Sequence, residues 1–176
     1  MEGIITFLGV FLSLGSANVQ PAVGDKAPTF YLGTSEGAPF FLNSYVDVNA
    51  KEESKQPILL SFFGTWWLPC KTEIPVLHNL QKQYPQVNFL LFNVEEKSDL
   101  VNKYIQKHKI TRPILSALYS VVVKKFSMVS NKNVATLPQL GIIDSDRNLF
   151  SVHEGHAPAE ESEVEGNLQT LLKPVQ

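Results

Sequence analysis

The stretch TWWLPC, from Thr65 to Cys70, places the chain's only cysteine in a pattern typical of thiol chemistry. Thiol–disulfide exchange within one chain needs two sulfurs: one attacks the substrate disulfide, and the other resolves the mixed disulfide that forms. At Cys-x-x-Cys spacing the first sulfur would stand at position 67, where this chain has Trp67. Without a second thiol, the chain cannot close a dithiol cycle by itself.

The remaining thiol has two interpretations. Cys70 shares a predicted helical stripe with Ile74 and Leu77, which favours a buried and inert side chain. Glu73 lies one turn away and is a candidate modulator, since like-charge repulsion would raise the pKa of the thiol; the alternative is a solvated carboxylate. If Cys70 acts alone as a catalytic thiol, it needs an external resolving thiol.

The elements around this stretch predict a βαβ unit. Ile58–Phe63 is almost continuously apolar, as in a strand that is covered on both faces. Pro69–Tyr84 has apolar residues at helical spacing, and Val87–Val94 is a second apolar strand. Strand, helix and strand in this order predict two parallel strands joined by a right-handed crossover, with Cys70 in the first turn of the helix.

The rest of the chain continues the alternation of strands and helices, so the sequence predicts an α/β sandwich with a mixed sheet. The expected elements are a hairpin of Thr29–Leu32 and Pro39–Leu42, an exposed loop at Val46–Gln56, a helix at Ser98–His108, a strand at Pro113–Leu118, a short helix at Tyr119–Met128, a hairpin of Gln139–Asp144 and Leu149–His153, and a helix at Ala159–Leu172.

Several segments together resemble the thioredoxin-like superfamily, and within it the TlpA/ResA-type redoxins, which are exported thiol-disulfide oxidoreductases. The segments are GDKAPTF at 24–30, FGTW at 63–66, CKTEIP at 70–75 and TLP at 136–138. The likeness covers about residues 21–173. It implies a three-layer sandwich with an N-terminal β-hairpin and a βα insertion, and it implies that the first active-site cysteine of the family is replaced by Trp67.

The resemblance also implies a peptide groove. In this fold Pro138 would follow a cis peptide bond, and the residue before it, Leu137, would offer backbone groups that pair with an extended peptide. Trp66, Trp67, Leu137 and Pro138 would then form an apolar groove for a protein or peptide segment. The ring of Trp67 either extends this groove or plugs it, and the sequence leaves both alternatives open.

The N-terminus predicts export. Ile4–Leu14 is an uncharged apolar run too short to cross a bilayer, and Gly15-Ser16-Ala17 follows as a cleavage-site pattern. We therefore expect a signal peptide at 1–17 and one thioredoxin-like domain at 18–176, in the periplasm or cell envelope. No basic residue precedes Lys26, so the alternatives are a true start that lies upstream, an uncleaved membrane anchor and a buried N-terminal strand.

The bulk composition excludes several classes of function. A net charge of −2 with no basic cluster gives no reason to expect nucleic acid.

His153 and His156 lack a nearby third ligand, so we expect no metal, and no motif indicates a cofactor. Three hypotheses remain: a binding or accessory module without dithiol activity, a one-thiol reductase or peroxiredoxin-like peroxidase that uses Cys70, and a structural domain whose partner surface lies elsewhere.

Overall fold

The fold is built on a five-stranded mixed sheet. The computed structural model describes residues 21–33, 38–94, 98–110, 114–116, 122, 126, 137–155 and 158–173. The strand order is β5-β4-β3-β6-β7, with β3 parallel to β4, β4 parallel to β5, and β6 antiparallel to both β3 and β7. The strands are β3 (Ile58–Phe63), β4 (Asn88–Asn93), β5 (Ile114–Ser116), β6 (Gln139–Ile143) and β7 (Leu149–Glu154).

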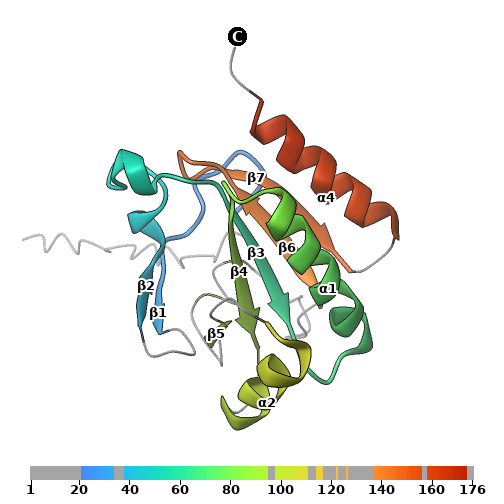
Figure 1. Ribbon diagram of the computed structural model, residues 1–176. Helices are drawn as coiled ribbons and strands as arrows, with labels where there is room; N and C mark the ends of the chain where they lie inside the picture. Colours follow the sequence, from blue (N-terminus) through green and yellow to red (C-terminus); the bar gives the residue numbers. More distant parts are fainter. Residues whose placement is uncertain are drawn as a thin grey trace, which may run out of the picture.

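Three helices lie on one side of this sheet (Figure 1), and they are α1 (Leu68–Gln83), α2 (Ser98–His108) and α4 (Pro158–Leu171). The predictions for these three helices are confirmed to within one residue at each end. Each helix buries an apolar stripe against the sheet, for example Val164 and Leu168 of α4. α2 and β5 follow β4 in the chain, and β5 adds an edge strand beside β4.

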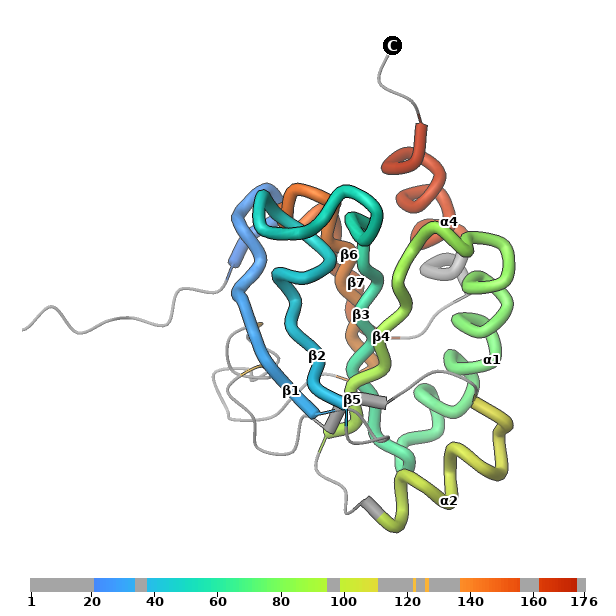
Figure 2. The backbone as a smooth tube through the Cα atoms, turned by 60° about the vertical axis from the view of Figure 1, so that its left-hand side comes forward, coloured from blue at the N-terminus to red at the C-terminus, as the bar shows by residue number. Residues whose placement is uncertain are grey.

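The N-terminal hairpin covers the opposite face (Figure 2). It consists of β1 (Tyr31–Gly33) and β2 (Pro39–Phe41), followed by the short 3-10 helices η1 (Leu42–Ser44) and η2 (Glu52–Ser54). Val46 is completely buried, so the expectation of an exposed loop over Val46–Gln56 is wrong at its start. Burial of an apolar side chain there anchors the connection to the core.

The central strand divides the core into two clusters. All six residues of β3 are buried, because its alternating side chains face apolar layers on both sides. Leu60 and Phe62 pack toward the hairpin, whereas Leu59 and Phe63 pack toward the helices. Sheet, hairpin layer and helix layer therefore make the three-layer α/β sandwich that the sequence predicts.

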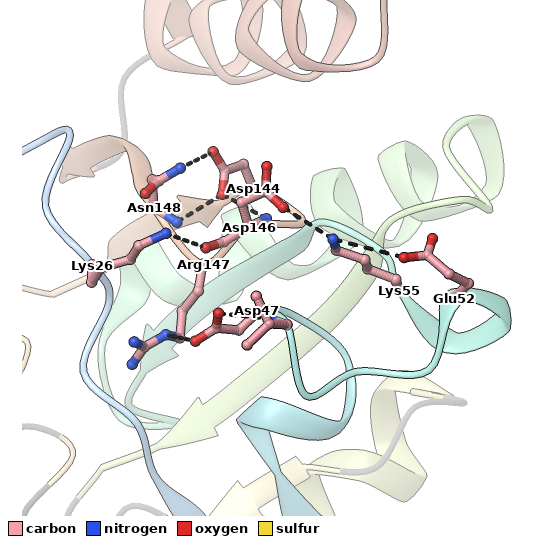
Figure 3. A network of polar contacts seen from close by, with 9 residues as sticks. Lys26, Asp47, Glu52, Lys55, Asp144, Asp146, Arg147 and Asn148 are labelled. Carbon is pink, nitrogen blue, oxygen red and sulfur yellow. Dashed lines mark hydrogen bonds and ion pairs between the residues drawn. The ribbon is translucent and has the colours of Figure 1, made fainter.

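A polar network closes the end of the sheet that lies beyond Ile143 (Figure 3). Arg147 Nε pairs with Asp47 Oδ2 at 2.7 Å, and Lys55 Nζ pairs with Asp146 Oδ1 at 3.0 Å. A hydrogen bond from the amide of Val48, reinforced by the facing Arg147, lowers the pKa of Asp47. The hydrogen bond to Asp146 raises the pKa of Lys55. These contacts tie the β6–β7 turn to the segment after the hairpin.

Some predictions fall outside the described residues. They include the segment 1–17 and most of the helix expected at Tyr119–Met128, of which Val122 and Phe126 are described and buried in the hairpin-side cluster. Among the helices that the structure describes, none has the length and hydropathy needed to cross a bilayer.

Candidate functional site

The loop Gly64–Trp67 connects the carboxyl end of β3 to the start of α1. The amide of Trp67 donates to the Gly64 carbonyl at 3.2 Å, which closes a turn, and the amide of Lys71 donates to the Trp67 carbonyl at 3.3 Å. Trp67 is thus the N-cap residue of α1, with extended backbone, and Pro69 follows in the first turn, where its missing N–H costs nothing. The polar network lies at the other end of β3, so it makes no part of this site.

The indole of Trp67 reaches the segment that precedes β6. Its Nε1–H donates to the carbonyl of Leu137 at 2.9 Å, and the Leu137–Pro138 peptide bond is cis. Trp67 keeps 43% of its surface exposed. The Leu137 carbonyl is therefore already engaged by the indole of Trp67. An extended peptide that used this acceptor, as the family resemblance implies, would have to displace the indole.

Trp66 lies beside it and makes the site's surface apolar. The two indole rings meet edge to face with centroids 5.8 Å apart. Trp66 packs so closely on Gly64 that a Cβ at that glycine would lie 2.9 Å from Trp66 Nε1. Trp66, Trp67 and Leu68 are 55%, 43% and 69% exposed, and we call these three residues the tryptophan surface. Exposed aromatic and aliphatic side chains in one place favour contact with a partner.

Cys70 faces away from this surface. Its side chain is completely buried, in the helix-side core cluster that also contains Ile74 and Leu77. An apolar environment disfavours a thiolate, which is the form that attacks disulfides and peroxides. The thiol is thus shielded both from solvent and from any substrate that docks on the tryptophan surface.

Glu73 is buried, with only 3% of its surface exposed, so the alternative of a solvated carboxylate is wrong. Ser61 of β3 explains its position, because its hydroxyl donates to Glu73 Oε2 at 3.1 Å. A buried carboxyl group needs such a partner to offset the loss of water. Sequence reasoning missed Ser61, although it is the one polar residue in the apolar run of β3 and shares its face with Leu59 and Phe63.

His153 belongs to a hydrogen-bonded cluster between β7 and α4. Its Nε2 lies 3.2 Å from both Ser151 Oγ and Asn167 Nδ2, and the side chain is 6% exposed. His156 lies outside the described residues. Within the described part of the chain, no group of three or more histidine, cysteine, aspartate or glutamate residues is arranged to hold a metal ion.

Comparison with known proteins agrees with this architecture. ResA of Geobacillus kaustophilus, a thiol-disulfide oxidoreductase, is 28% identical over 92% of this chain and 85% of its own length. The thioredoxin-like protein YneN of Bacillus subtilis is 30% identical over 80% of this chain and 76% of its own. A secreted disulfide oxidoreductase of Mycobacterium tuberculosis superposes with a TM-score of 0.65 at 18% identity, over 81% and 96% of the two chains.

Residues 23–151 match the AhpC/TSA family, and this range includes the hairpin, the site loop, α1 and the segment around Pro138. The chain therefore belongs to the AhpC/TSA family, as a thioredoxin-fold protein that is similar in sequence to the ResA thiol-disulfide oxidoreductases and to YneN.

Proposed function

We propose that this protein is an exported binding or accessory module that acts in envelope redox reactions or protein maturation without performing dithiol exchange. One observation carries the proposal: position 67 holds an indole bonded to the Leu137 carbonyl, while the only thiol, Cys70, is completely buried. Exchange needs an exposed thiolate and a second sulfur to release the product, and this site offers neither.

The tryptophan surface is the proposed contact for a partner protein or peptide. Its aromatic side chains are large, exposed and held by the turn at Gly64, so little side-chain entropy is lost on binding. The Leu137 carbonyl is occupied by Trp67, which disfavours pairing with an extended strand at that acceptor. We therefore infer that a partner is recognised mainly through apolar side chains that pack on Trp66 and Leu68.

Export rests on the apolar segment Ile4–Leu14 and on the likeness to a secreted oxidoreductase. Expression of the full chain with a C-terminal epitope, followed by cell fractionation, tests this part of the proposal. Recovery of the epitope only in the cytoplasmic fraction would refute export and leave the site argument standing.

The catalytic part is tested by turnover of a model disulfide substrate. We expect no turnover by the wild type and measurable turnover by Trp67→Cys, which restores the spacing of two sulfurs. Trp66→Cys is the matched control, because it adds a thiol one residue away from the required position and should stay inactive. Wild-type turnover without an added small thiol would overturn the proposal.

Labelling of the thiol tests the alternative of a one-cysteine enzyme. The burial of Cys70 predicts that a thiol reagent labels the native protein slowly and the unfolded protein rapidly. Rapid labelling of the native protein at neutral pH would instead support a one-thiol reductase or peroxidase.

The partner surface is tested with Leu68→Arg, which places a charge on the tryptophan surface at a residue that is 69% exposed and should abolish capture of partners from an envelope fraction. Val48→Arg is the control, since Val48 is 88% exposed and its neighbour Asp47 belongs to the polar network at the other end of the sheet. Equal capture by both variants would show that the partner binds elsewhere.

A further inference from the structure

A cavity of about 180 Å³ lies between α1, β4 and the end of α2, on the helix side of the sheet. Its walls are apolar, with Ile74 and Leu77 from α1, Phe89 and Leu91 from β4, and Ile110. α2 ends beside the cavity: at Lys109 the backbone turns with φ of 51°, and the amide of Ile110 donates back to the Ile105 carbonyl at 3.1 Å. This turn places Ile110 in the lining of the cavity.

Two imidazoles from different helices line the same cavity. His78 comes from α1 and is half-buried, and His108 is the last residue of α2. The ring of His108 lies on the ring of Tyr104, with centroids 4.2 Å apart, and this contact positions it. Asn79 and Gln81 complete the polar part of the lining. A neutral imidazole carries one ring nitrogen that accepts a hydrogen bond.

We propose that this cavity binds a single phenolic ring, whose hydroxyl donates to the imidazole of His78 or His108. The size fits one ring, because an apolar cavity of about 150 Å³ admits benzene, whereas drug-sized ligands need about 300 Å³ or more. The apolar walls receive the ring, and the imidazoles receive the hydroxyl.

The electrostatics select a phenol over an aryl carboxylate. His108 and Gln81 lie in the last turns of α2 and α1, and helix C-termini carry negative partial charge, which repels anions and attracts donors. Lys82 and Lys107 occupy the same last turns without lining the cavity. Among the described residues that line the cavity, none carries a permanent positive charge that would hold a carboxylate.

The test is titration of the ¹⁵N-labelled full chain at pH 8 with p-cresol, toluene and benzoate, followed by NMR. We expect p-cresol to shift the amides of residues 74–81, 89–91 and 110 saturably, with a Kd of about 1 mM, as suits a ligand of this size. Toluene should bind about fivefold more weakly, for the loss of one hydrogen bond, and benzoate should not saturate these shifts.

Variants locate the acceptor. We expect at least one of the variants His78→Leu and His108→Leu to bind p-cresol no more tightly than toluene. The same variant should bind toluene with the affinity of the wild type. Gln83→Ala, an exposed position at the end of α1 outside the cavity, is the control and should match the wild type. Titration with N-acetyl-tyrosinamide distinguishes two sources of the phenolic ring. If it shifts the same amides as p-cresol, the ligand is the tyrosine of a partner protein; if it does not bind, the ligand is a free phenol.

The proposal is overturned if p-cresol causes no saturable shift at the cavity. It is also overturned if wild-type affinities for p-cresol and toluene are equal, or if neither histidine variant separates them. These results do not depend on the tryptophan surface, because none of the three residues of that surface lines the cavity.

Discussion

Replacing Trp67 by phenylalanine tests the hydrogen bond between Trp67 and Leu137. The change keeps an aromatic ring at the start of α1 and removes the Nε1–H donor, which lies 2.9 Å from the Leu137 carbonyl oxygen. A hydrogen bond between neutral groups contributes about 1 kcal/mol net to stability, because both partners bond to water when the protein unfolds. Since Trp67 is 43% exposed, water can replace part of the bond in the variant. We therefore expect Trp67→Phe to lower the free energy of unfolding by about 0.5–1 kcal/mol.

Urea unfolding followed by far-UV circular dichroism measures this loss without relying on the fluorescence that the substitution removes. Trp66→Phe is the matched control: it also replaces an indole, at a residue that donates no hydrogen bond within the described part of the chain. A domain of this size should melt about 2–4 °C lower for each kcal/mol lost. Equal stability of the two variants would count against this hydrogen bond.

The chain's two tryptophans also give a direct NMR reading of the contact, because both lie in the site and give only two indole signals. The Nε1 proton of Trp67 should exchange with solvent more slowly than that of Trp66, since it is bonded to Leu137. If the two indole protons exchange at the same rate and both phenylalanine variants are equally stable, the contact is absent in solution and the reasoning about the groove fails.

Three further perturbations test other parts of the structure. The pKa of Asp47 is lowered by the amide of the next residue and by the guanidinium that faces it. The contribution of Asp47 to stability is therefore complete above the unfolded pKa of 3.8 and is lost as the pH falls through the lower folded pKa. Asp47→Asn should thus weaken the fall in the free energy of unfolding at acid pH, as measured by urea unfolding at a series of pH values. Gly64→Ala places a Cβ 2.9 Å from Trp66 Nε1, so the exposed indole should move and its NMR signal should shift while far-UV circular dichroism stays unchanged. Glu73→Ala should cost about 1–3 kcal/mol in urea unfolding, because the buried Ser61 hydroxyl loses the acceptor it uses, whereas Glu73→Gln keeps an acceptor and should cost less.

The periodic parts of the fold were predictable from sequence. The apolar run Ile58–Phe63 and the helical spacing after Pro69 determine which faces are buried, and the structure confirms both elements. The hairpin was placed less well: β1 begins at Tyr31, two residues after the expected Thr29, although the Phe30 carbonyl still accepts a hydrogen bond from the amide of Leu42, just after β2, at 3.2 Å. Strand ends depend on pairing with a partner, which a single segment does not reveal.

The position of polar side chains was harder to predict. Glu73 falls on the helix where either solvent or the sheet was a reasonable neighbour, and its bond with the hydroxyl of Ser61, twelve residues earlier, contributes to its burial. The hydrogen bond between Trp67 and Leu137 joins residues seventy positions apart. The cavity beside His78 is lined by residues of α1, β4 and the end of α2. Each of these features arises from tertiary contacts that periodicity along one segment cannot encode.

In the proposed function, Trp67 has two effects: it engages the Leu137 carbonyl, and it leaves the site without a second sulfur. A pair of variants separates these two effects. Trp67→Ala removes the indole from the Leu137 carbonyl without supplying a sulfur, and Trp67→Cys removes the indole and supplies one. If the indole only blocks the acceptor, both variants should gain affinity for an extended cysteine-free peptide relative to the wild type, and by similar factors. Turnover of disulfides should appear in the cysteine variant alone, because only there can one sulfur attack and another resolve. Trp67→Cys could catalyse disulfide turnover while Trp67→Ala gains no affinity for the peptide. In that case the wild type lacks turnover because it has no second sulfur, and not because the indole blocks the Leu137 carbonyl.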